Sequence, residues 1–376
     1  MSNPEMNLRM RRFRAVDGGA CRLTRFVVAI CLLACGSSSA TAFARGTASF
    51  PCSDNDKDCA AKAAKDHVVT TLKFWNGAFA KPVEARVGSA PPELVQFLRL
   101  QNIKDGFPNK PRAAPIAPAF LRYLRAAIAE LPDTVKRSLS GRLAGIHLID
   151  DLGGTGFTDM VFDDRSNAAA GFVVLDAAVL NAHTANSWAS WKDNRPFKAQ
   201  PGFRMAVRIE EDREDNRKNA IQYILLHELG HVLAINEKVH PPWNLEPKEI
   251  TSIADFPFAR LSWAIEGDRY ATKFDASFPQ RKDLVFYLGA RLKADQMLAT
   301  YDSLERTNFP SLYAATSPGD DFAEAFASYV HTVLMKKPYQ IRIYRDGRIV
   351  KTVQSCWEQA RCAEKRKLLE RILAGP

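Results

Sequence analysis

The stretch 227–231 reads H-E-L-G-H, and it constrains this 376-residue chain more than any other feature. Residues i and i+4 of a helix lie one above the other, so the imidazoles of His227 and His231 can bind one metal ion. Glu228 would lie beside that ion, where it could take a proton from a water molecule. Apolar residues recur at three- and four-residue steps through 219–235, and this spacing predicts a buried helix there.

The alternative is a chance arrangement of two core histidines and a glutamate. The pattern H-E-x-x-H arises by chance in about one chain in a hundred of this length, and less often within an apolar helix. A buried, unpaired glutamate beside two buried histidines is also costly unless a metal compensates its charge. We therefore predict that 227–231 forms part of a zinc site.

A catalytic zinc ion needs a third protein ligand and an open position. The metzincin arrangement would have a glycine at 234 and a histidine at 237, where this chain has Ala234 and Glu237, so that class is disfavoured. His240 lies past the expected end of the helix, beside two prolines, and is predicted to be a loop residue.

A second helix is predicted over 317–331. Asp320, Glu324 and His331 recur there at steps of four and seven, so they share a face. Carboxylates four residues apart allow one to bind the metal while the other holds a ligating histidine by its second ring nitrogen. The alternative for Asp320 is structural, because with Ser317 as N-cap it would form a capping box at the start of the helix.

These two motifs carry a resemblance to a known family. The stretch 227–231 and the later run Tyr313-x₆-Asp320-x-Phe-Ala-Glu324-Ala-Phe resemble the catalytic domain of anthrax lethal factor and similar bacterial gluzincin-type zinc metallopeptidases. The resemblance covers roughly 221–331, is patchy between the motifs and does not reach the terminal segments. It implies a zincin-like fold, a Zn²⁺ cofactor and a protein or peptide substrate.

The resemblance also implies roles at six positions: zinc ligands at His227, His231 and Asp320, a general base at Glu228, an oxyanion donor at Tyr313 and a supporting carboxylate at Glu324. The family has a glutamate where this chain has Asp320, which is one methylene shorter. Either the second helix lies closer to the metal, or Glu324 or Asp321 binds it instead, or the site is weakened or lost.

Residues 1–44 predict an export signal. A basic stretch ends at Arg25, the apolar run 26–35 follows, and small residues then end in A-F-A at Ala44, a suitable cleavage site. Ten apolar residues are too few to span a bilayer. The alternative is a buried core helix, which the arginine-rich lead disfavours. Release after Ala44 is favoured narrowly over lipidation, because L-L-A-C at the end of the apolar run also resembles a bacterial lipobox that would attach a lipid to Cys35.

Cysteine usage agrees with export to a secreted or periplasmic location. Three of the seven cysteines fall within the signal, which leaves Cys52, Cys59, Cys356 and Cys362. Two close pairs near the chain ends predict two disulfides formed in an oxidising compartment. Local pairing is the simplest arrangement, and end-to-end pairing stays open. Zinc binding by four cysteines is disfavoured because neither pair has the C-x₂₋₄-C spacing.

The net charge of +10 is less informative than it first looks. Residues 1–44 carry six arginines against two acidic residues, a net +4, which leaves +6 for a mildly basic body. No lysine or arginine run interleaves with aromatic residues, so a nucleic-acid partner has little support. Attraction to an anionic surface such as the cell envelope would be unspecific.

The remaining pattern predicts an α+β fold. After the signal at 1–44, a helical segment over 45–140 precedes a zincin-like domain over 141–335 and a hairpin-helix tail over 336–376. Helices are expected at 60–74, 92–100, 119–131, 259–265, 283–304 and 364–373, strands at 145–150, 157–163, 171–176 and 205–209, and a hairpin at 339–353 around Asp346-Gly347.

In a zincin, the edge strand of the sheet lies along the cleft and pairs with extended peptide. The segments 171–176 and 205–209 are both candidates for that strand. The favoured function is an exported zinc metalloendopeptidase, a hydrolase that cleaves peptide bonds with Glu228 as general base. The alternatives are a catalytically inactive zincin-fold binding protein of the cell envelope and, more weakly, a zinc hydrolase of a non-peptide cell-wall bond.

Overall fold

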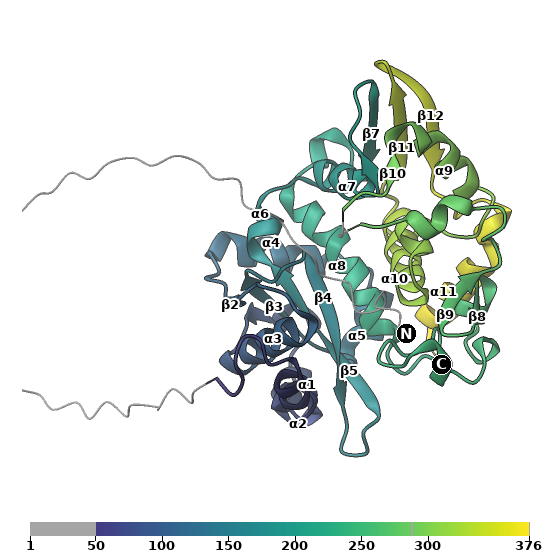
Figure 1. The fold of residues 1–376 in the computed structure, drawn as a ribbon. Coiled ribbons are helices and arrows are strands. Elements are labelled where there is room, and N and C mark those ends of the chain that lie inside the picture. The colour runs from purple at the N-terminus through teal and green to yellow at the C-terminus, as the bar shows by residue number, and fades with distance from the viewer. Residues whose placement is uncertain (1–49, 287–288, 376) are drawn as a thin grey trace, which may run out of the picture.

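The computed structural model describes residues 50–286 and 289–375 (Figure 1). The predicted export signal at 1–44, with its three cysteines and the alternative lipidation of Cys35, lies outside the described residues. The described chain combines helices with several small sheets, so the predicted α+β class is confirmed at this coarse level.

The largest sheet has five strands in the order β1-β3-β5-β4, with β2 paired to β3. The strands β1, β3 and β5 are parallel to one another, whereas β4 runs antiparallel to β5. Their bounds are Val87–Ser89 (β1), Arg112–Ala113 (β2), Leu143–Asp150 (β3), Gly156–Phe162 (β4) and Ala168–Asp176 (β5). The segments β1 and β2 come from before residue 140, so the sheet joins the helical segment to the chain that follows it.

The strand β5 is interior because it pairs with β3 on one side and with β4 on the other, and both of its faces are buried. Phe172 and Val174 pack into one apolar cluster with Phe97 of the N-terminal helices, whereas Val173 and Leu175 pack into the other. A near-continuous apolar run of this kind is typical of a strand covered on both sides. Of the two candidates for the edge strand, 171–176 is therefore wrong, and β4 occupies that edge of the sheet.

Helices cover both faces of this sheet, and Figure 1 shows α8 between the sheet and α10. The helices are α1 (Lys57–Lys65), α2 (Leu72–Phe79), α3 (Pro92–Asp105), α4 (Pro118–Ala129), α5 (Asp133–Ser140), α6 (Ala177–Asn181), α7 (Ala185–Asn194), α8 (Arg217–Ala234), α9 (Met297–Leu304), α10 (Pro318–Tyr329) and α11 (Ala363–Ala374).

Three of the expected helices are wrong in whole or in part. The predicted helix 60–74 is two helices, separated by the 3₁₀ turn Val68–Thr70 in a β-branched stretch that disfavours a helix. The segment 259–265 is a 3₁₀ turn followed by β8 (Trp263–Glu266), which pairs with β9 (Arg269–Thr272). Of 283–304, only α9 is an α-helix.

The predicted hairpin is confirmed, and it belongs to a three-stranded sheet in the order β12-β11-β7. These strands are β7 (Phe203–Arg208), β11 (Gln340–Arg345) and β12 (Arg348–Gln354). Both turn residues have positive φ, 48° at Asp346 and 78° at Gly347, as a type I′ turn requires. The tail is thus paired in register with the strand expected at 205–209. One further pair of short strands joins β6 (Phe197–Lys198) to β10 (Leu292–Lys293).

Both disulfides form locally, Cys52–Cys59 and Cys356–Cys362. Local pairing is therefore confirmed, and the two bonds indicate an oxidising compartment. Among the helices of the described residues, none is long and apolar enough to cross a membrane.

Candidate metal centre

The helix α8 carries both histidines of the sequence motif. Its N-cap, Asn216, accepts a hydrogen bond from the amide of Asn219, and every residue from there to Ala234 is buried. A helix buried all round lies inside the protein rather than on its surface. His227 and His231 are 9% and 5% exposed, so their ring nitrogens lie in a largely dehydrated site.

The helix α10 supplies the carboxylates. Ser317 is its N-cap and accepts a hydrogen bond from the amide of Asp320 at 3.1 Å. The hydroxyls of Thr316 and Ser317 in turn donate to Oδ2 of Asp320, at 3.1 and 2.8 Å. Asp320 is therefore part of the N-terminal cap of α10, and its other oxygen, Oδ1, lies toward the histidines of α8.

The two helices approach closely at Gly230, in the middle of the histidine motif. A Cβ atom built there would lie 2.8 Å from the Cα of Ala323, closer than side chains tolerate. The glycine thus lets α10 pack directly against α8. This close approach is the physical reason why an aspartate, one methylene shorter than a glutamate, reaches the histidines.

Two imidazoles and one carboxylate meet at this point. Oδ1 of Asp320 lies 3.9 Å from Nε2 of His227 and 3.7 Å from Nε2 of His231. Across residues 50–286 and 289–375, these three side chains form a group whose ligand atoms lie within 4.8 Å of one another. Ligand atoms of a tetrahedral zinc site are about 3.4 Å apart, given bonds of about 2.1 Å. The two distances from Asp320 to the histidines exceed that value by about 0.3 and 0.5 Å.

The other two carboxylates considered as third ligands are directed elsewhere. Asp321 is on a different face of α10 and accepts hydrogen bonds from Lys365 at 2.5 Å and Trp263 at 3.0 Å. Oε1 of Glu324 lies 2.9 Å from Nδ1 of His227, on the far side of that ring from Asp320. A carboxylate that accepts from Nδ1 leaves Nε2 available for a metal.

Glu324 is held by two further groups. Lys192 of α7 donates to its Oε1 at 2.5 Å, and Ser311 donates to its Oε2 at 2.6 Å. Burial alone raises the pKa of this carboxyl, but the Lys192 ammonium and the hydrogen bond with His227 lower the pKa below its usual value. Glu324 therefore remains ionised as a partner of His227.

Glu228 lies next to the edge strand β4. It is 7% exposed, and its Oε2 accepts a hydrogen bond from the Thr158 hydroxyl at 3.0 Å. Gly156 begins the same strand, and a Cβ there would lie 2.9 Å from the carbonyl oxygen of Val174 and 3.5 Å from Oε1 of Glu228. The start of β4, at Gly156 and Thr158, thus packs directly against the Glu228 carboxylate.

Tyr313 begins a 3₁₀ turn, Tyr313–Ala315, on the other side of His227. Its ring centroid lies 5.4 Å from that of His227 and 4.7 Å from that of Phe286. The Lys192 ammonium lies 4.6 Å from the centre of the tyrosine ring, within the range of a cation–π contact.

Two other histidines named from the sequence do not join this cluster. Nε2 of His331 lies 2.7 Å from the carbonyl oxygen of Ile209, and burial lowers the pKa of His331 to about 4. It is a core residue at the π-helical turn that follows α10. His240 lies on the loop after α8, with Nδ1 2.7 Å from the carbonyl oxygen of Pro241.

Sequence reasoning missed Lys192, Ser311 and Thr158. Lys192 and Thr158 contact motif residues across 132 and 70 positions of the chain, whereas Ser311 lies only 13 positions before Glu324. A lone lysine in the α7 segment carries no local signal that would identify it. Comparisons of the chain with protein-family models, curated proteins and solved structures gave no match.

Proposed function

We propose that this protein is an exported zinc-dependent metalloendopeptidase. The observation that carries the proposal is the buried group of His227, His231 and Asp320 with the Glu228 carboxylate beside it. The resemblance of the two motifs to gluzincin-type peptidases supports the same function. The two disulfides agree with export, because such bonds persist in oxidising compartments.

Zinc suits this donor set. Two imidazoles and one carboxylate are a common ligand set of catalytic zinc and leave a fourth position open. Soft thiolate ligands are absent from the cluster, and both remaining cysteine pairs are engaged in disulfides. When bound, zinc supplies Lewis acidity and lowers the pKa of a water molecule.

Glu228 is the proposed general base. The Thr158 hydroxyl holds its Oε2, so the carboxylate is oriented by the sheet edge rather than by solvent. It accepts the proton of the attacking water and delivers it to the leaving amine. Tyr313 donates a hydrogen bond to the oxyanion that develops on the scissile carbonyl.

The sheet edge favours a peptide substrate over a cell-wall bond. The strand β4 pairs with β5 on one side, and on its other side the described residues form one bridge, between Thr71 and Phe162. That bridge is at the far end of β4 from Thr158. The stretch beside Glu228 therefore offers backbone groups to which an extended peptide can add as a further strand.

The test compares wild type with Glu228→Gln. We expect both proteins to contain one zinc ion, and we expect cleavage of a peptide library by wild type only. Glu266→Gln, at an exposed glutamate, is the matched control and should cleave like wild type. Retained turnover in Glu228→Gln would contradict the assignment of the base. Zinc binding without cleavage by wild type would instead support the inactive binding protein of the cell envelope.

A further inference from the structure

A buried ion pair joins the C-terminal helix to the helix that carries Asp320. Nζ of Lys365 in α11 lies 2.5 Å from Oδ1 of Asp321, and neither side chain is exposed. The indole of Trp263 donates to the other oxygen at 3.0 Å. Breaking a fully buried pair of this kind leaves one charge stranded, so the pair holds its two helices in a fixed relation.

Asp321 follows Asp320 directly. Consecutive residues of a helix point about 100° apart, so one turn of α10 directs Asp320 at the histidines and Asp321 at the tail. The contact Lys365–Asp321 therefore fixes the rotation and height of the turn that presents the candidate ligand.

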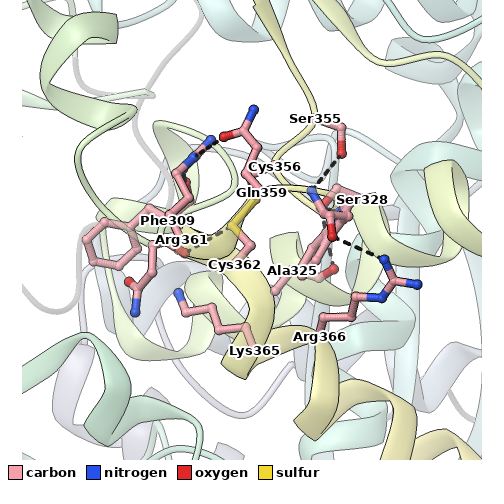
Figure 2. Close-up of a disulfide and its surroundings, with 12 residues drawn as sticks. Phe309, Ala325, Ser328, Ser355, Cys356, Gln359, Arg361, Cys362, Lys365 and Arg366 are labelled. Carbon is pink, nitrogen blue, oxygen red and sulfur yellow. Dashed lines mark hydrogen bonds between the residues drawn. A yellow bond between two sulfur atoms is a disulfide. The ribbon is translucent and has the colours of Figure 1, made fainter.

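The disulfide Cys356–Cys362 closes the segment that leads into α11, and Lys365 follows three residues later. Figure 2 shows the bond between Phe309 and Arg361 on one side and Ser328 of α10 on the other. The Arg361 guanidinium donates to the carbonyl oxygens of Thr307 and Phe309, at 3.0 and 2.8 Å.

The segment 356–365 contacts both the loop before Tyr313 and the C-terminal end of α10. The loop at 307–309 leads into Ser311 and Tyr313, and the Lys365 ammonium lies 4.7 Å from the ring centre of Phe309. At the other end of α10, the Trp357 indole lies 3.3 Å from the Ser328 hydroxyl. One covalently closed turn thus contacts the helix of Asp320 and the loop of Tyr313.

We propose that the tail segment 356–365 positions the metal centre, with Lys365 acting through Asp321 on Asp320. This inference rests on the proposed metal site and adds that its third ligand is placed by the disulfide-closed tail. Lys365 touches neither metal nor substrate and is a positioning residue. A merely stabilising tail would alter unfolding and leave the metal affinity of the folded protein unchanged.

The chain contains a matched control for the disulfide. Cys52–Cys59 closes a loop of similar length, with a sequence separation of 7 against 6, and packs with the N-terminal helices. We expect Cys356→Ser/Cys362→Ser to bind Zn²⁺ at least about tenfold more weakly in competition with a chelator, the usual effect of losing a residue that orients a metal ligand. Cys52→Ser/Cys59→Ser should bind Zn²⁺ like wild type, although thermal unfolding should shift in both.

A second pair of variants tests Lys365 itself. Lys365→Met/Asp321→Asn removes both charges together, so no buried charge is left stranded. We expect zinc affinity to fall about tenfold, while Lys367→Met, at an exposed lysine of the same helix, leaves it unchanged. Zinc affinity equal to wild type in the folded Cys356→Ser/Cys362→Ser protein would overturn the inference and leave the proposed function intact. Absence of zinc binding by wild type would overturn both.

Discussion

Lys192 of α7 and Glu324 of α10 lie 132 positions apart in the chain and form a buried ion pair at 2.5 Å. The pair determines what Glu324 does, because a carboxylate held by Lys192 and His227 is not free to rotate toward the metal position. Asp320 and Glu324 therefore face different nitrogens: Oδ1 of Asp320 lies near Nε2 of both histidines, and Oε1 of Glu324 lies near Nδ1 of His227.

Lys192→Met should destabilise the protein by about 3–5 kcal/mol, because it strands the buried Glu324 charge. It should also weaken zinc binding, since the partner of His227 loses its own support. Urea denaturation and chelator competition measure the two effects. Lys218→Met breaks the more exposed pair with Glu130 and should cost at most about 1 kcal/mol. Equal effects of the two substitutions would contradict the role of Lys192.

The three carboxylates of α10 should differ in their effect on zinc. Glu324→Gln keeps an oxygen for Nδ1 of His227 but loses the charge that supports that ring. We therefore expect zinc affinity to fall about 10–100-fold. Asp320→Ala removes the ligand itself and should lose more than this. Metal titration of the two variants compares the losses. A larger loss in Glu324→Gln than in Asp320→Ala would indicate that Glu324, rather than Asp320, is the ligand.

Gly230→Ala should push α10 away from α8, because the new Cβ would lie 2.8 Å from the Cα of Ala323. Overpacking of this kind costs about 1–3 kcal/mol, and the longer reach from Asp320 should weaken zinc binding. Gly77→Ala in α2 is the matched control, since a Cβ there meets nothing within 4 Å. It should be neutral or stabilising. Unchanged zinc affinity in Gly230→Ala would show that the close approach does not set the reach of Asp320.

Asp193 should make stability depend on pH. Burial raises the pKa of its carboxyl to about 7 from 3.8, with Glu324 adding to and Lys192 opposing the rise. The folded protein therefore keeps a proton that the unfolded chain has released, and stability falls as pH rises from about 4 to 7. The slope of this contribution is about 1.4 kcal/mol per pH unit.

Asp193→Asn should remove that contribution and so be more stable than wild type above pH 7, with little difference near pH 4. Urea midpoints measured across this range check the expectation. Asp212→Asn, at a side chain that is 95% exposed, should follow wild type at every pH. A parallel pH profile of Asp193→Asn and wild type would show that Asp193 is not the group responsible.

Much of the fold was readable from local patterns. The helices α8 and α10 follow from apolar steps of three and four residues, and the hairpin at 340–354 follows from the turn residues Asp346 and Gly347. Each of these signals lies within one element, so no distant contact is needed to interpret it.

Two of the errors arose from strand pairing, in one case with distant strands and in the other with the adjacent strand. The run 171–176 looks like any apolar strand, and its interior position depends on β3 and β4 pairing on its two sides. The segment 259–265 has helical spacing, yet Trp263–Glu266 pairs with Arg269–Thr272 as a hairpin. Strand pairing overrides weak helix propensity in such short segments.

The sequence by itself determined the two imidazoles and the adjacent Glu228, because the spacing of i and i+4 acts within one helix, and it favoured the local disulfides over end-to-end pairing. Only the tertiary structure decided which carboxylate meets the histidines. The position of Asp320 depends on the close packing of Gly230 against Ala323. The ion pairs of Lys192 with Glu324 and of Lys365 with Asp321 keep the other two carboxylates directed elsewhere. Each is a contact between distant parts of the chain, and the geometry of packing rather than any local pattern fixes it.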